Sequence, residues 1–195
     1  MPDHESPVST TLTGTPVLRS TALATPVGRA LLVVSDLGLV ALRLGDDDRS
    51  LAAEVARDLQ GATVRDDPTG LADAAGAVVA WFDGDDALAG LPVDLRVGPF
   101  GRRVLDEVRR IPRGATRTYS EVAVAIGAPR SVRAVARACA TNPVGLAIPC
   151  HRVVRADGGL AGYRWGLDRK AALLRLEAEQ RPRPVPIATP GTGNP

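Results

Sequence analysis

The stretch SEVAVAIGAPRSVRAVARACA, residues 120–140, decides the fold of the second half of this 195-residue chain. Residues 120–126 and 131–140 are predicted helices, and the Gly-Ala-Pro sequence between them is a tight break of the kind that joins two crossed helices. The second helix carries two arginines, Arg133 and Arg137. This pattern matches the outline of a helix-turn-helix, which binds DNA in some proteins and is an ordinary helical pair in many others.

The remaining hydrophobic pattern predicts an α+β fold with its strands in the first half. Runs rich in Val, Leu and Ala, separated by short loops, are typical of two or three antiparallel strands. Apolar residues at helical spacing follow them and continue through the second half. The predicted strands are residues 17–24, 29–35 and 39–44, and the further predicted helices are residues 49–60, 71–82, 100–111 and 167–179.

The formal net charge of +2 hides two halves of opposite sign. Residues 1–98 contain 7 arginines against 15 acidic residues, a net charge of −8. Residues 99–195 contain 16 arginines and one lysine against 7 acidic residues, a net charge of +10. This asymmetry favours contact between the second half and a polyanion, for which nucleic acid is the natural candidate, although a merely solvated basic face gives the same count.

Composition limits the class of protein and its compartment. No apolar stretch reaches the ~18 residues of a membrane span, and the polar beginning of the chain lacks the features of a secretory signal. The two cysteines, Cys139 and Cys150, are too few for a disulfide scaffold or a four-ligand zinc site. We therefore expect a cytoplasmic protein with no metal and no membrane partner.

Changes in composition divide the chain into four predicted segments. Residues 1–15 are a polar leader, predicted to be flexible, and residues 181–195 are a Pro- and Gly-rich tail, predicted to be disordered because it can bury little apolar surface. Between them we expect one domain over residues 16–98 and a second, basic domain over residues 99–180.

Chemistry is concentrated at Cys150 and His151, within the segment IPCHRVV of residues 148–154. A thiolate is a strong nucleophile, but a free thiol has a pKa of about 8.5 and needs a base or a positive field to ionise near neutral pH. Successive side chains of extended backbone point to opposite faces, so the two side chains need not meet directly, and a water could bridge them. Glu177, on the closing helix, is a candidate to orient the imidazole. The alternative is a small buried thiol with a chance histidine neighbour.

The segment from Asn142 to Val154 resembles the active-site signature of the O6-alkylguanine-DNA alkyltransferases. The resemblance is close over residues 100–179, faint before them, and nearest to the C-terminal domain of the bacterial adaptive-response methyltransferase. The matching motifs, in order and at family spacing, are Ile111-Pro112 with Gly114, Thr118-Tyr119-Ser120-Glu121-Val122-Ala123, Arg133-Ala134-Val135, Asn142-Pro143-Val144, Ile148-Pro149-Cys150-His151-Arg152-Val153-Val154, Gly162-Tyr163-Arg164-Trp165-Gly166, Arg169-Lys170 and Leu173-Leu174.

The resemblance implies a role for each catalytic residue. Cys150 would accept the alkyl group, with His151 drawing its proton through a water and Glu177 holding His151. Tyr119 would donate its hydroxyl proton to the departing guanine, and Asn142 would brace the active-site loop. The thioether formed is not hydrolysed, so each molecule would act once, as a methylated-DNA--protein-cysteine S-methyltransferase without a cofactor.

The resemblance also implies how DNA and the damaged base are bound. Arg133 would enter the duplex through the minor groove where the damaged nucleotide is flipped out, with Ser131 beside it at the start of the same helix, and Arg137 and Arg113 adding phosphate contacts. The extruded base, an O6-alkylguanine or an O4-alkylthymine, would lie in a pocket lined by Tyr163, the Arg164 N–H and the carbonyls of Cys150 and Val153.

The resemblance further implies a fold and an oligomeric state. A small ribonuclease H-like domain would be followed by a helical, winged-helix-like domain that contains the helix-turn-helix, and the protein would act as a monomer on double-stranded DNA. Three alternatives remain: a sensor of alkylated DNA that transfers nothing, a thiol hydrolase using Cys150 and His151, and a plain helix-turn-helix regulator. The presence of Cys150 disfavours the sensor, the basic half disfavours the hydrolase, and the segment 148–154 disfavours the regulator.

Overall fold

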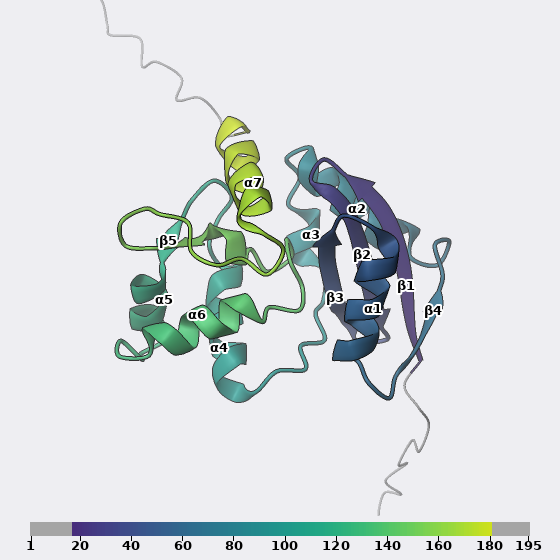
Figure 1. Ribbon diagram of the computed structural model, residues 1–195, viewed down its shortest axis with the longest axis horizontal. Helices are drawn as coiled ribbons and strands as arrows, with labels where there is room; N and C mark the ends of the chain where they lie inside the picture. Colours follow the sequence, from purple (N-terminus) through teal and green to yellow (C-terminus); the bar gives the residue numbers. More distant parts are fainter. Residues whose placement is uncertain (1–16, 181–195) are drawn as a thin grey trace, which may run out of the picture.

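The computed structural model describes residues 17–180, and its α+β architecture confirms the predicted fold class (Figure 1). The leader predicted over residues 1–15 and the tail predicted over residues 181–195 lie outside the described residues. A sheet and helix α1 form one side of the molecule in Figure 1, and helices α4, α5 and α6 form the other.

The first half is built on a four-stranded mixed sheet with strand order β3-β2-β1-β4. β1 pairs antiparallel with β2, β2 pairs antiparallel with β3, and β4 is parallel to β1. The three antiparallel strands match the predicted ones to within one or two residues. The elements of this half are β1 (Val17–Thr25), β2 (Gly28–Ser35), β3 (Gly38–Gly45), α1 (Asp48–Asp58), β4 (Thr63–Asp66), α2 (Ala72–Phe82) and α3 (Ala87–Gly90).

The sheet is buried on both faces, and its side chains alternate between two clusters. On β2, Leu31 and Val33 pack with Leu51 and Val55 of α1, which lies over one face of the sheet (Figure 1). Leu32 belongs to the larger cluster on the other face, which is shared with α2 and the second half of the chain. The alternation follows from the two-residue period of a strand.

Sequence patterning did not predict the edge strand β4. All four of its residues are exposed, so it has no apolar alternation, and only its parallel register with β1 defines it. Its connection to β3 passes through α1, whose first turn is capped by Asp47: the Oδ1 of Asp47 accepts a hydrogen bond from the Ser50 N–H at 2.8 Å.

The second half consists of short helices around one buried cluster, with a two-stranded parallel ladder. The helix-turn-helix prediction corresponds to α5 and α6, which contact each other across the turn at Gly127, a glycine with φ +69°. The predicted closing helix 167–179 is α7. The elements are α4 (Pro99–Arg109), β5 (Arg117–Thr118), α5 (Tyr119–Ala125), α6 (Val132–Ala140), the 3-10 helix η1 (Cys150–Arg152), β6 (Val153–Val154) and α7 (Leu167–Glu179).

Strand β3 joins the two halves. The Leu42 N–H donates to the Pro143 carbonyl at 3.0 Å, and the Gly145 N–H donates to the Leu42 carbonyl at 3.0 Å. Residues 143–145 thus extend the edge of the sheet, and they belong to the segment that leads to Cys150. The larger of the two apolar clusters also contains residues of both halves, whereas the smaller one belongs to the first half alone.

Candidate functional site

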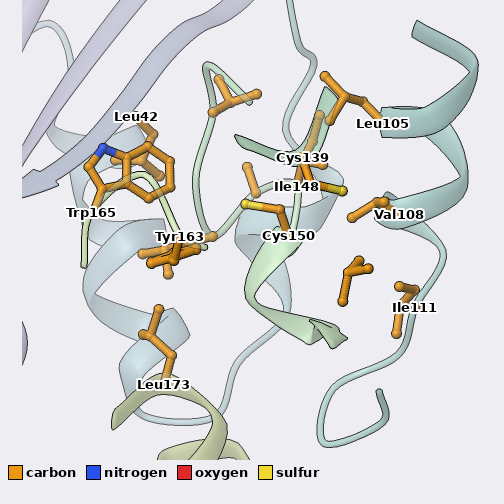
Figure 2. Close-up of a cluster of buried hydrophobic side chains, with 14 of the residues drawn as sticks. Leu42, Leu105, Val108, Ile111, Cys139, Ile148, Cys150, Tyr163, Trp165 and Leu173 are labelled. Atoms are coloured by element: carbon orange, nitrogen blue, oxygen red, sulfur yellow. The ribbon is translucent and has the colours of Figure 1, made fainter. Parts of the chain in front are cut away.

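The Cys150 thiol lies in a buried cluster and is held by Asn142. Its side chain is 3% exposed, and Figure 2 shows it among Ile148, Tyr163 and the apolar residues of α4. The Asn142 Nδ2 donates to the Ile148 carbonyl at 2.8 Å and to the Cys150 Sγ at 3.2 Å. The Asn142 Oδ1 accepts from the Val144 N–H at 3.1 Å. One side chain therefore spans the loop from residue 142 to residue 150.

The middle of this loop is packed between β3 and Trp165. A Cβ at Gly145 would meet the Trp165 ring at 2.6 Å and the Leu42 carbonyl at 3.2 Å, so only glycine fits there. The next residue, Leu146, has φ +63°, the left-handed region that is unfavourable for a leucine. Its side chain is buried, which fixes this conformation by packing.

Tyr119 reaches the site because of a helix cap and a parallel ladder. The Thr118 Oγ1 accepts from the Glu121 N–H at 3.1 Å, and the Glu121 Oε2 accepts from the Thr118 N–H at 2.6 Å, a capping box that starts α5 at Tyr119. Thr118 pairs with Val154 and Arg117 with Val153. The ladder, which the sequence did not predict, places the first residue of α5 beside the strand that follows Cys150.

His151 and Glu177 form a buried pair. The His151 Nε2 and the Glu177 Oε1 are 2.9 Å apart, and both side chains are fully buried. The same carboxylate accepts from the Arg152 Nε and Nη2, at 3.0 and 2.7 Å, and from the Gly114 N–H at 2.9 Å. The His151 Nδ1 has no hydrogen-bond partner among the described residues. Burial lowers the pKa of His151 and outweighs the hydrogen bond and charge of Glu177, which raise it.

Lys170 is a residue of the site that the sequence analysis named only within a matching motif, without a role. It is fully buried on α7, and its Nζ donates to the carbonyls of Val153 at 2.6 Å and Ala161 at 3.1 Å. The ammonium lies 5.9 Å from the centre of the Tyr119 ring. Burial lowers its pKa, whereas the thiols of Cys150 and Cys139 favour its charged form. The spacing of Lys170, Leu173 and Glu177 is the only signal, since it places all three on one helix face.

Burial sets the ionisation of the two candidate acids at the site. It raises the pKa of Cys150 to about 11, against the opposing effects of the Asn142 hydrogen bond and the Lys170 charge. Burial, followed by the charges of Cys139 and Cys150, raises the pKa of Tyr119 to about 12. At neutral pH the thiol and the phenol are therefore both protonated, and the thiol needs a base before it can react.

The predicted pocket residues Val153 and Tyr163 belong to the same buried cluster as Cys150. Val153 is buried and its carbonyl already accepts from Lys170, while the Cys150 carbonyl accepts from the Val153 N–H. Tyr163 and Trp165 meet edge to face at 5.2 Å, and the Tyr163 hydroxyl and Trp165 Nε1 are buried without a partner among residues 17–180. The Arg164 side chain points away from the pocket and pairs with Asp58 at 2.5 Å.

The predicted DNA-contacting residues divide into two groups. Ser131 is the N-cap residue of α6, and Arg133 and Arg137 are exposed on that helix, where neither guanidinium has an ion pair within residues 17–180. The Arg113 guanidinium instead lies 4.5 Å over the Trp81 ring and donates to the Trp81 carbonyl and the Gln180 Oε1. Its side chain is only 12% exposed, and the phosphate contact of Arg113 stays a prediction.

Comparison with known proteins decides the family. Residues 99–179 match the family described as 6-O-methylguanine DNA methyltransferase, DNA binding domain. A methylated-DNA--protein-cysteine methyltransferase of Mycolicibacterium paratuberculosis is 44% identical over 117 residues, which are 60% of this chain and 71% of that protein. The chain belongs to the methylated-DNA--protein-cysteine methyltransferase family.

Other members of this methyltransferase family match both halves. The bifunctional transcriptional activator/DNA repair enzyme Ada of Escherichia coli is 44% identical over 157 residues, 80% of this chain. This chain spans 44% of the length of that relative. A crystal structure of Mycobacterium tuberculosis OGT in complex with DNA has a TM-score of 0.68 and 34% identity, and covers 86% of this chain and 96% of its own.

Two further features of the described residues concern membranes and metal ions. Within residues 17–180, no helix is both long enough and apolar enough to cross a membrane. Over the same residues, no three His, Cys, Asp or Glu side chains are grouped where they could hold a metal ion.

Proposed function

We propose that this protein repairs DNA by transferring a methyl or other alkyl group from the O6 atom of guanine in duplex DNA to the Cys150 Sγ, once per molecule. Two neighbouring contacts support the proposal best. The Asn142 amide donates a hydrogen bond to the Cys150 Sγ, and the next residue, His151, forms a buried pair with Glu177. This is a nucleophile, base and carboxylate set on a chain of the methyltransferase family.

The first step is removal of the thiol proton. Because the Glu177 carboxylate accepts a hydrogen bond from the Nε2–H of His151, Nδ1 is the unprotonated, basic nitrogen of the neutral ring, and it is free to accept a proton. A bridging water carries the proton from Cys150 to Nδ1. The resulting thiolate is stabilised by the Asn142 amide and by the charge of Lys170, both of which lower the pKa of Cys150.

The second step is displacement at the alkyl carbon. The thiolate forms an S–C bond while the C–O6 bond breaks, and the electron pair leaves with guanine. Tyr119 donates its hydroxyl proton to the departing base, so guanine leaves as a neutral base and the negative charge moves to the Tyr119 oxygen. The Lys170 ammonium over the Tyr119 ring favours the phenolate that this transfer leaves behind. The thioether is stable, so Cys150 is not regenerated.

The remaining parts of the proposal concern DNA. Helix α6 enters the minor groove, Arg133 replaces the extruded nucleotide in the stack, and Ser131 and Arg137 contact the backbone. The base, an O6-alkylguanine or an O4-alkylthymine, is flipped out at a cost of a few kcal/mol and is held by Tyr163, the Arg164 N–H and the Val153 segment. The protein acts as a monomer and in a reducing cytoplasm, where the thiol stays free.

We also propose the finer description of the fold. The order β3-β2-β1-β4, with α1 between β3 and a β4 parallel to β1, supports a ribonuclease H-like domain over residues 16–98. Helices α4 to α6 with the β5–β6 ladder support a winged-helix-like domain over residues 99–180.

The test is the intact mass of the protein after mixing with a slight excess of duplex DNA that carries one O6-methylguanine. We expect a gain of one methyl group, located on the peptide that contains Cys150. The matched controls are Cys150→Ala, which should gain nothing, and Cys139→Ala, which removes the other buried cysteine and should still be methylated. Tight binding without a mass change would identify a sensor, and repeated turnover would identify a hydrolase.

A further inference from the structure

Asp58, the last residue of α1, joins two segments that flank Cys150. Its Oδ2 accepts from the Arg43 Nη2 at 2.8 Å and from the Arg164 Nη2 at 2.5 Å. Arg43 lies on β3, and Arg164 directly follows Tyr163 in the loop before α7. One carboxylate outside the site therefore holds two arginines that come from different parts of the fold.

Arg43 connects this carboxylate to the nucleophile. Its side chain is 2% exposed, and its Nη1 donates to the backbone carbonyl of Asn142 at 3.4 Å. The side chain of the same Asn142 donates to the Cys150 Sγ at 3.2 Å. Three hydrogen bonds therefore connect Asp58 to the sulfur of Cys150, through Arg43 and Asn142.

The buried guanidinium of Arg43 is only partly paired. Burial and the charge of Arg164 lower the pKa of Arg43 to about 10, and the carboxylates of Asp58 and Glu54 oppose this. Its Nε is buried without a partner among the described residues. A buried guanidinium so incompletely paired depends strongly on the carboxylate that remains.

The loop that carries Asn142 also borders empty space. A cavity of about 700 Å³ is lined by Arg43, Asp58 and Arg164 on one side and by Thr141 and Pro143 on the other. Thr141 and Pro143, on either side of the fully buried Asn142, thus border open space on one side. On that side the hydrogen bond from Arg43 to the Asn142 carbonyl helps to hold this stretch of backbone.

We propose that Asp58 is a positioning residue for alkyl transfer: through Arg43 it holds Asn142, and so Cys150, and through Arg164 it holds the loop of Tyr163 on the opposite side of the base pocket. This inference rests on the proposed function. Displacement of a reacting group by about 1 Å can cost a hundredfold in rate, so a carboxylate that does not touch the substrate can still control the reaction.

The test compares Asp58→Asn with Asp48→Asn. Asp48 is at the other end of the same helix and pairs with an arginine of the sheet, Arg29, at 2.7 and 2.9 Å, but nothing links it to the active-site loop. The side chains of Asp58 and Asp48 are 37% and 51% exposed. The two substitutions therefore remove the same kind of contact from one helix, and only one of them reaches Asn142.

The first readout is the limiting rate of methyl transfer under single-turnover conditions, at saturating duplex with one O6-methylguanine. We expect Asp58→Asn to lower this rate by roughly ten- to a hundredfold, with half-saturation by DNA changed less than about twofold, since α6 is untouched. Asp48→Asn should match the wild type in both quantities.

The second readout needs no DNA. The rate at which iodoacetamide modifies Cys150 is measured against pH, and Asp58→Asn should shift this profile to higher pH because a displaced Asn142 no longer stabilises the thiolate. Loss of stability alone would not move the profile of the folded molecules. If Asp58→Asn fails to fold, Arg43→Met removes the buried charge together with the tie to Asn142, and should give the same shift.

The outcomes separate this inference from the proposed function. If the wild-type protein transfers no methyl group, the proposed function is refuted. The pH profile of Cys150 modification then still tests whether Asp58 acts on Asn142 through Arg43. If the wild type transfers the methyl group and Asp58→Asn has the same transfer rate and the same thiol pH profile, the positioning role is overturned. Equal losses in Asp58→Asn and Asp48→Asn also overturn it, because the effect would then belong to α1 as a whole.

Discussion

Replacement of Glu177 by glutamine should cost this protein stability in a way that depends on pH. The carboxylate is fully buried on α7 and accepts hydrogen bonds from His151, Arg152 and Gly114. Burial alone would raise its pKa, but the hydrogen bonds from His151 and Arg152 outweigh burial and lower it to about 2, from an ordinary value of 4.5. At about 1.4 kcal/mol per pKa unit, this corresponds to roughly 3 kcal/mol of unfolding free energy at pH 7.

The sign of the pH dependence follows from the lowered pKa. The folded state binds the proton more weakly than the unfolded chain, so the stabilisation is fully present above pH 4.5 and is lost as the pH falls through 2. Urea unfolding at pH 7, 5 and 3 should show Glu177→Gln less stable than the wild type by roughly 3 kcal/mol at pH 7, with a smaller difference at pH 3.

The matched control is Glu179→Gln, an exposed carboxylate on the same helix. Its unfolding free energy should follow the wild type at each pH. A difference between Glu177→Gln and the wild type that stayed the same from pH 7 to pH 3 would refute the reasoning, because the cost would then come from packing and not from the buried charge.

Three further substitutions test other parts of the site. Asn142→Ala removes the donor to the Cys150 Sγ, so the thiol pKa should rise further above its ordinary value, and iodoacetamide labelling followed by mass at fixed pH should be slower than in the wild type; an unchanged rate would contradict the contact. Gly145→Ala places a methyl group 2.6 Å from the Trp165 ring, so thermal unfolding should reveal a loss of about 1–3 kcal/mol, and full stability would mean that the ring moves freely. Arg137→Ala should weaken binding to undamaged duplex and reduce the slope of log affinity against log salt by about one, whereas an unchanged slope would exclude a phosphate contact of Arg137.

Helices and strands that carry a clear apolar periodicity in their own sequence were predictable. The helix predicted over residues 167–179 is α7, and the three antiparallel strands were found because each carries an apolar pattern with clear loops between. The strand β4 and the ladder β5–β6 were not, because their few residues have no periodicity of their own and exist as strands only through their partners.

The candidate site was predictable in its residue types and only partly in its contacts. The resemblance named Asn142 and His151, and the structure places both beside Cys150. It could not show that Arg113 stacks on Trp81, because that contact joins segments 32 residues apart that no local pattern relates. Lys170 was named in a motif but given no role, because a lysine on a helix is normally solvated and its burial depends on the carbonyls that the fold brings to it.

The hydrogen bonds between Leu42 and residues 143–145 have a consequence for any attempt to isolate the basic half. A fragment that begins near residue 99 would leave the Gly145 N–H and the Pro143 carbonyl without their partners, and would expose the apolar surface that β3 and α2 now cover. Such a fragment should aggregate unless the first half is supplied in trans. Two co-expressed pieces cut between α3 and α4 should instead reassemble, and their reassembly would restore the loop of Cys150 and could be scored by methyl uptake.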